Sequence, residues 1–183
     1  MPQRRAGSTH DLLRNTVDKI SGDAWWNHTL EPEFPGYDVR PDLQLIDNHG
    51  QITLVDFSLV QPTASSYASR SAREGLSAAN ERERVKVNKY RALAAQAGAK
   101  FCAFVVERFG GVNKAGRELI EQLALQAELN TIGIEEPFPG DPSLLHVFWS
   151  RVMRAVHCGN AQLVQQALQS CATFRLQRLF FSA

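Results

Sequence analysis

The first segment of the chain has apolar residues at the spacing of a helix with one buried face. These residues are Leu12, Leu13, Val17 and Ile20. A capping Ser8 or Thr9 precedes them and Gly22 ends the run, so the pattern predicts a first helix that begins near Thr9. Two prolines and a glycine then indicate a connector over residues 25–40, with room for a short strand at residues 28–31.

Two alternating apolar patterns after the connector predict a β-hairpin. Strands are expected over residues 42–46 and 51–59, and the Asp-Asn-His-Gly segment between them is typical of a tight turn. The two strands should therefore pair in antiparallel fashion. The next segment, residues 61–77, is rich in serine and other small residues, which favours a surface loop.

The second half of the chain has both helical and strand patterns. A long helix is expected over residues 78–97, ending at Gly98, and the apolar run at residues 100–106 is typical of a buried central strand. Further helices are expected over residues 114–128, 142–157 and 161–170. Gly159 and Asn160 are expected to form a tight corner between the last two helices.

This order of elements favours an α/β domain with a mixed β-sheet flanked by helices and a C-terminal helical hairpin. The 183 residues, of which 44% are hydrophobic, suit one domain that buries a sizeable core. A single domain over residues 1–183 is expected, with its core at about residues 9–130 and the helical hairpin at about residues 141–183.

The composition of the chain indicates the cellular compartment but not the class of molecule that the protein binds. The 20 basic and 19 acidic residues nearly cancel, so net charge alone indicates neither nucleic acid nor a membrane surface as a partner. The three cysteines form no CxxC pair or zinc pattern, and no run of about 18 apolar residues occurs. We expect an intracellular protein with no membrane segment, and nucleus and cytoplasm remain open alternatives.

Two aspartates carry the clearest chemical signal. Asp42 opens one strand of the predicted hairpin and Asp56 lies late on the other, with thirteen residues between them. Antiparallel pairing could therefore bring both carboxylates to one end of the sheet. Two such carboxylates can hold a hard divalent ion, which supplies the charge stabilisation and the activated water that phosphodiester hydrolysis needs.

The long helix after the loop carries cations that could serve the same site. The candidates Arg82, Lys86, Lys89 and Tyr90 lie at spacings of three and four residues, which puts them on one face. Residues 70–100 hold eight lysines or arginines against three glutamates, a local excess that could meet phosphates. The expected nucleic-acid-binding residues are Arg70, Arg73, Arg82, Lys86 and Tyr90. The alternative for the same stretch is a solvated helix face.

At these residues the sequence resembles a known family. The run Arg40–Pro41–Asp42, thirteen further residues, Asp56 and the downstream segment ERERVKVNKY resemble the restriction-like endonuclease domain of site-specific non-LTR retrotransposons, a member of the PD-(D/E)XK class. The family pattern is a PD pair, an acidic residue 12 to 14 residues later and a Lys-Tyr pair on the next helix. Its last pair is matched by Lys89 and Tyr90.

The resemblance implies a restriction endonuclease-like fold and a Mg²⁺- or Mn²⁺-dependent endonuclease that nicks DNA. Asp42 and Asp56 would be the metal ligands, and Lys89 would stabilise charge or orient the attacking water, with Lys86 as its substitute. Glu31, upstream of the PD pair, matches the place where this fold often adds a third catalytic carboxylate. The implied partners are DNA and a reverse transcriptase with its RNA, and a homodimer is an open alternative.

One position departs from the usual pattern of the class. The catalytic lysine normally lies two residues after the second acid, where this chain has Ser58. Either the lysine has moved to the helix, as in the retrotransposon type, or the site is inactive. The alternatives are therefore an active nuclease, a junction-resolving nuclease that works as a two-fold dimer, and a catalytically inactive nucleic-acid-binding or protein-interaction module on the same fold.

Overall fold

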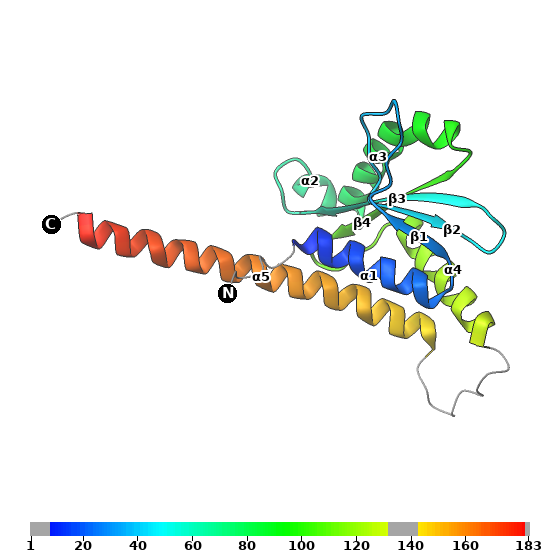
Figure 1. Cartoon of the computed structure of the whole chain (residues 1–183). Coiled ribbons are helices and arrows are strands. Elements are labelled where there is room, and N and C mark those ends of the chain that lie inside the picture. Colours follow the sequence, from blue (N-terminus) through cyan, green and yellow to red (C-terminus); the bar gives the residue numbers. More distant parts are fainter. Residues whose placement is uncertain (1–7, 132–142, 182–183) are drawn as a thin grey trace.

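The chain folds around one mixed β-sheet. The computed structural model describes residues 8–131 and 143–181. Within them, the sheet has four strands in the order β1-β2-β3-β4, namely Asn27–Leu30, Leu43–Ile46, Ile52–Val60 and Lys100–Glu107. The first three strands are antiparallel neighbours, and β4 lies parallel to β3. Helices cover both faces, which confirms the expected α/β class (Figure 1).

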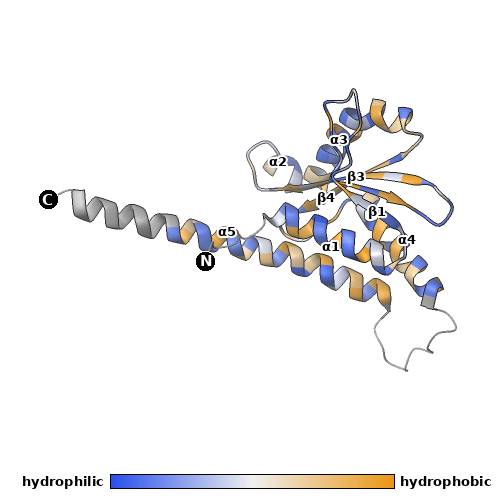
Figure 2. Cartoon of the chain, viewed as in Figure 1, coloured by the Kyte–Doolittle hydropathy of each residue, from blue (hydrophilic) through white to orange (hydrophobic). Residues whose placement is uncertain are grey.

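The helices divide between the two faces of the sheet. On one face α1, α4 and α5, at Thr9–Asp23, Lys114–Thr131 and Leu144–Phe181, enclose the main core. On the other face α3, at Ser77–Gln96, packs on β3 and β4, and the short α2, at Ala68–Ser71, lies in the loop before it. Figure 2 shows apolar and polar residues interspersed along α1, as expected for a helix with one face on a core.

The first helix begins where its capping residues predict. Ser8 accepts a hydrogen bond from the backbone N–H of Asp11, and the Asp11 carboxylate accepts one from the backbone N–H of Ser8. This reciprocal pair satisfies two backbone donors that the helix leaves free. It starts α1 at Thr9 and places His10 in the first turn.

The strand β3 carries opposite chemistry on its two faces. Val55 and Phe57 point into the main core, whereas Asp56 and Ser58 point toward α3. Successive side chains of a strand alternate between faces, so two polar residues at this spacing share one side. The functional groups of β3 are therefore on the α3 side of the sheet.

The expected C-terminal helical hairpin is wrong, because α5 runs without a break from Leu144 to Phe181. Gly159 is not a corner: a Cβ atom there would lie 2.4 Å from the side chain of Thr9, so the glycine lets α5 approach α1 closely. Asn160 also has a different role, since its amide donates to the carbonyl oxygen of Arg108 at 2.8 Å. Beyond these contacts α5 projects past the rest of the domain (Figure 1).

None of the helices in the part of the chain that the structure describes is both long enough and apolar enough to cross a bilayer.

Candidate functional site

The hairpin places Asp42 beside Asp56. The register pairs Leu43 with Val55, and the backbone N–H of Asp42 donates to the carbonyl oxygen of Val55 at 3.0 Å. The Asp42 carboxylate in turn accepts a hydrogen bond of 2.7 Å from the backbone N–H of Phe57. Antiparallel pairing thus places the two aspartates next to each other, as predicted. They do not lie at one end of the sheet, however, because Asp56 is in the middle of β3 and pairs with Ala103 of β4.

Asp56 is a buried carboxylate held by two residues of α3. Its side chain is 5% exposed, and Lys86 Nζ lies 2.5 Å from its Oδ2. The hydroxyl of Tyr90 donates to Oδ1 at 2.5 Å and also lies 2.8 Å from the carbonyl oxygen of Arg40. Burial, together with the negative charge of Asp56, raises the pKa of Tyr90, so this hydroxyl stays protonated and acts as a donor.

Three residues of α3 follow the polar side of β3 in order. Arg82 donates from Nε to the hydroxyl of Ser58 at 3.2 Å, Lys86 pairs with Asp56, and Tyr90 lies beyond it. Their spacing of four residues puts them in one line along the helix. Ser58 occupies the position where the usual pattern has a lysine, and its hydroxyl accepts a hydrogen bond from Arg82 of α3.

The structure separates the two candidate lysines. Lys86 reaches Asp56, whereas Lys89 is exposed and holds its ammonium 5.1 Å from the centroid of the Tyr90 ring. Lys89 lies about 60° around the helix axis from Lys86. At this angle the side chain of Lys89 points away from the two carboxylates. Only one member of the predicted Lys89–Tyr90 pair therefore contacts Asp56. Tyr90 does so, and the ammonium group beside Asp56 belongs to Lys86 instead of Lys89.

A histidine that the sequence did not indicate completes the site. Nε2 of His10 lies 3.1 Å from Oδ2 of Asp42. That hydrogen bond raises the pKa of His10 despite partial burial. Burial alone would raise the pKa of Asp42, but the hydrogen bonds from His10 and Phe57 hold it below its usual value. His10 is 32 residues from Asp42 in the chain, and no local spacing connects them.

Glu31, the expected third acid, lies elsewhere. It follows β1 with a positive φ of 47°, and its backbone N–H donates to the carbonyl oxygen of Asp42 at 2.9 Å. Its carboxylate forms ion pairs with Arg14 and, at 3.2 Å, with Arg40. These two guanidinium groups compensate its charge, and the structure does not bring it to the side chains of Asp42 and Asp56.

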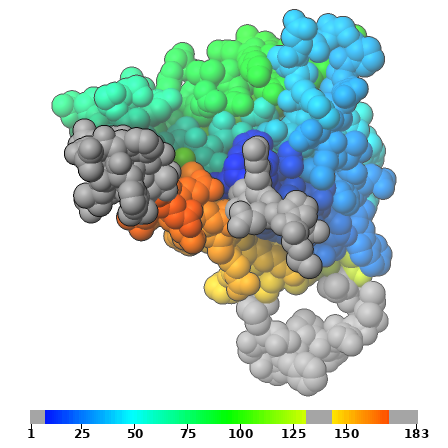
Figure 3. Space-filling model, turned by 60° about the vertical axis from the view of Figure 1, so that its left-hand side comes forward, coloured from blue at the N-terminus to red at the C-terminus, as the bar shows by residue number. Residues whose placement is uncertain are grey.

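A groove of ≈ 400 Å³ opens beside His10 and Lys86, the partners of the two aspartates, although neither aspartate lines it. The residues that line it include His10, Phe57, Ser58, Arg82, Lys86 and Arg108. Figure 3 shows the elements that meet on this side of the molecule, with the start of α1 in blue, α5 in orange and the segment after β3 in teal. Arg70 and Arg73, predicted to bind nucleic acid, are exposed and do not line the groove.

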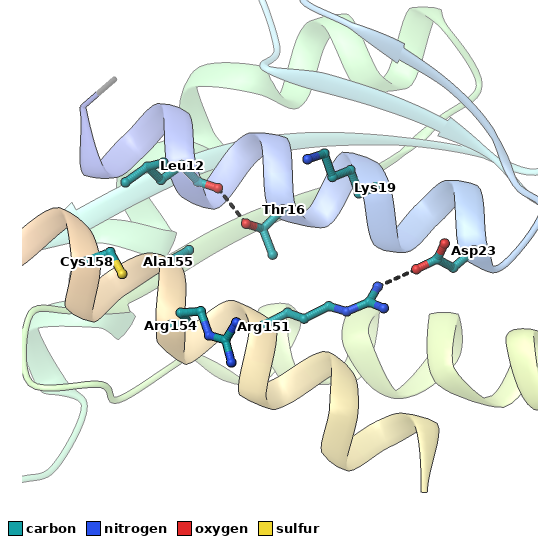
Figure 4. A pocket seen from close by; sticks show the side chains of 8 residues that line it. All are labelled: Leu12, Thr16, Lys19, Asp23, Arg151, Arg154, Ala155 and Cys158. Atoms are coloured by element: carbon teal, nitrogen blue, oxygen red, sulfur yellow. Dashed lines mark hydrogen bonds and ion pairs between the residues drawn. The ribbon is translucent and has the colours of Figure 1, made fainter. Parts of the chain in front are cut away.

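A second cavity, of ≈ 490 Å³, lies between α1 and α5 and contains none of the predicted site residues (Figure 4). Arg151 and Asp23 form an ion pair across it, and the hydroxyl of Thr16 donates to the carbonyl oxygen of Leu12 at 2.7 Å. Lys19 and Arg154 add two further positive charges to its lining. The exposed thiol of Cys158 lies at its edge.

The two described cysteines should differ sharply in reactivity. Burial raises the pKa of the Cys102 thiol to about 12, whereas Cys158 is exposed. Because the thiolate is the reactive form, we expect Cys102 to react at pH 8 at least about a thousandfold more slowly than an ordinary thiol. Iodoacetamide labelling of a Cys171→Ser variant, mapped by mass spectrometry, checks this. Equal labelling of both cysteines in the native protein would contradict the packing of β4 against α4.

The donor set of the site fits a hard divalent ion with few protein ligands. Two carboxylates lie side by side, but no cluster of three His, Cys, Asp or Glu side chains able to bind a metal occurs among the described residues. Magnesium commonly keeps several waters and binds through one or two carboxylates. An ion here would use Asp42 and Asp56 and fill its other positions with water or substrate oxygens.

Comparison of the chain with models of known protein families and with curated proteins found no match.

Proposed function

We propose that this chain is a Mg²⁺- or Mn²⁺-dependent endonuclease that hydrolyses DNA phosphodiester bonds. The observation that carries the proposal is the meeting of Asp42, Asp56 and Lys86 where β2 begins alongside β3, beside a groove lined by cations. Carboxylates for a divalent ion and an ammonium group next to them are the parts that phosphodiester hydrolysis requires.

Each group has a separate task in this proposal. Asp42 and Asp56 would hold the ion, which when bound neutralises charge on the phosphate and makes a bound water more acidic. His10 and the backbone N–H of Phe57 keep Asp42 ionised and oriented. The ammonium of Lys86 is placed to orient the attacking water or to stabilise the charge that develops on the phosphate.

The finer assignment, a restriction endonuclease-like domain of the retrotransposon type, belongs to the same proposal. Support comes from an antiparallel hairpin that carries the two acids, a parallel strand beyond it and a helix that supplies the lysine. In this assignment Lys86 replaces the lysine that the class places at Ser58. A reverse transcriptase and its RNA are the partners that this type of nuclease would have.

The catalytically inactive module is the second candidate, and the pairing of Asp56 favours it. Both oxygens of this carboxylate have partners within the chain, Tyr90 and Lys86. A buried carboxylate with such partners can persist without a metal. The groove would then bind nucleic acid while the acids served only to hold α3 on the sheet.

Metal binding distinguishes the two candidates. We expect Mg²⁺ or Ca²⁺ to stabilise the wild-type chain, by about 2.7 kcal/mol at one hundred times the dissociation constant. Asp42→Asn should abolish this stabilisation because it removes a charged ligand while keeping the shape of the side chain. Thermal unfolding with increasing metal concentration measures both effects.

Asp38→Asn is the matched control, since Asp38 is exposed in the connector and the same charge is removed. It should respond to the metal as the wild type does. A wild-type chain that no divalent ion stabilises, yet that binds DNA, would exclude the nuclease and leave the inactive module.

A further inference from the structure

The groove beside His10 and Lys86 holds two arginines that have only neutral hydrogen-bond partners among the described residues. Arg82 is oriented by the hydroxyl of Ser58 at 3.2 Å, and Nη1 of Arg108 lies 3.3 Å from the side-chain oxygen of Asn160. Neither guanidinium forms an ion pair with a carboxylate in the described part of the chain. Neutral partners thus fix the direction of two positive charges in a concave surface, an arrangement suited to phosphate oxygens.

Arg108 is held at this place by the fold. It follows β4 directly, and its backbone N–H donates to the carbonyl oxygen of Val60 at the end of β3. Its own carbonyl oxygen accepts a hydrogen bond of 2.8 Å from the amide of Asn160 on α5. The unbroken course of α5 past Asn160 therefore positions the arginine and also closes one side of the groove with Leu163.

The size of the groove limits what it can hold. Its ≈ 400 Å³ is near the lower end of the range for small-ligand pockets, and Leu59 and Leu163 give it apolar surface between the cations. A continuous duplex can meet a groove of this size only with its backbone. One or two nucleotides of a single strand can enter it, because unpaired bases can contact apolar side chains while their phosphates meet arginines.

We propose that this groove binds an unpaired, single-stranded segment of the DNA that is cut at Asp42 and Asp56, with Arg82 and Arg108 on its phosphates. The inference rests on the proposed function for the position of the cut. It adds a substrate class: single-stranded DNA, or a duplex with an unpaired flap, in place of a continuous duplex.

Binding without cleavage tests the inference. In Ca²⁺ or EDTA, fluorescence anisotropy would compare a labelled single strand, a duplex with an unpaired flap and the matching blunt duplex. We expect the first two to bind at least about tenfold more tightly than the blunt duplex. Arg82→Ala and Arg108→Ala should each weaken single-strand binding by about tenfold. Each should also reduce the log–log salt slope by about 0.7.

Two matched controls separate the groove from general charge effects. Arg117→Ala, at an exposed position of α4, removes the same charge and should bind as the wild type does. Leu163 is partly exposed, so its replacement should leave the fold intact. Leu163→Gln should weaken single-strand binding by removing apolar surface, and Leu163→Glu should weaken it further because it also adds a negative charge.

The outcomes separate this inference from the nuclease proposal. Equal affinity for blunt duplex and single strand, or equal effects of Arg82→Ala and Arg117→Ala, would overturn the groove assignment even if the chain cuts DNA. Tight single-strand binding that depends on Arg82 and Arg108 supports the groove assignment. With that binding intact, failure to cut in Mg²⁺ or Mn²⁺ overturns the nuclease alone.

Discussion

Lys86→Met is expected to lower the nicking of supercoiled plasmid by about a thousandfold, equivalent to about 4 kcal/mol of activation free energy. Lys89→Met is expected to leave nicking nearly unchanged. The reason is geometric, because Nζ of Lys86 lies 2.5 Å from Asp56 whereas Lys89 lies over the Tyr90 ring and faces solvent. Nicking rates of the two variants in Mg²⁺ and in Mn²⁺ measure the difference.

Stability must be followed in the same experiment. Removing one partner of a buried ion pair typically costs about 3–5 kcal/mol, so Lys86→Met should also lower the free energy of unfolding. Lys86→Arg keeps the charge and should fold more stably than Lys86→Met. Circular dichroism and urea unfolding establish that each variant is folded at the assay temperature. If Lys89→Met loses activity while a folded Lys86→Met nicks as the wild type does, the assignment of Lys86 is wrong.

Gly159→Ala is expected to destabilise the protein by about 2 kcal/mol, although alanine is the better helix former by about 1 kcal/mol. The new Cβ would lie 2.4 Å from the side chain of Thr9, and a backbone-attached atom cannot rotate away. The two helices would have to move apart. At this chain length the midpoint of thermal unfolding should fall by about 4–8 °C. Differential scanning calorimetry measures the shift.

A control and a compensating variant identify the cause. Gly75→Ala adds a Cβ with no atom within 4 Å and should change stability little. Thr9→Gly removes the clashing side chain, so it should offset part of the cost of Gly159→Ala in a double-mutant cycle. Independent effects of the two changes would mean that α1 and α5 do not meet at Gly159.

The hairpin and its two acids could be predicted because the information is local. Asp42 and Asp56 are brought together by one turn and by the period of two along each strand, which the sequence shows directly. For the lysine, the sequence predicted the helix that carries it but not which of Lys86 and Lys89 contacts Asp56. Which lysine reaches Asp56 depends on how α3 is rotated on the sheet, and packing of Tyr90 against Phe101 and Leu54 decides that rotation.

His10 and Arg108 could not be predicted as neighbours of the site. Each is far in sequence from the acids, and each arrives on an element whose position depends on the whole core: α1 for His10, the end of β4 for Arg108. A histidine in a helix and an arginine after a strand have no spacing that marks them as functional. Their roles follow from long-range packing alone.

The sequence by itself determined the elements from α1 to α4 apart from the short α2, the alternation along β3 and the pairing of Asp42 with Asp56, because these depend on neighbours within a few residues or across one turn. Only the tertiary structure decided that α5 is one helix and that Gly159 and Asn160 serve contacts with Thr9 and Arg108. In the sequence, a glycine followed by an asparagine is typical of a tight turn between two helices. A glycine is also required where two helices approach each other closely, and only the packed fold shows that Gly159 has this second role.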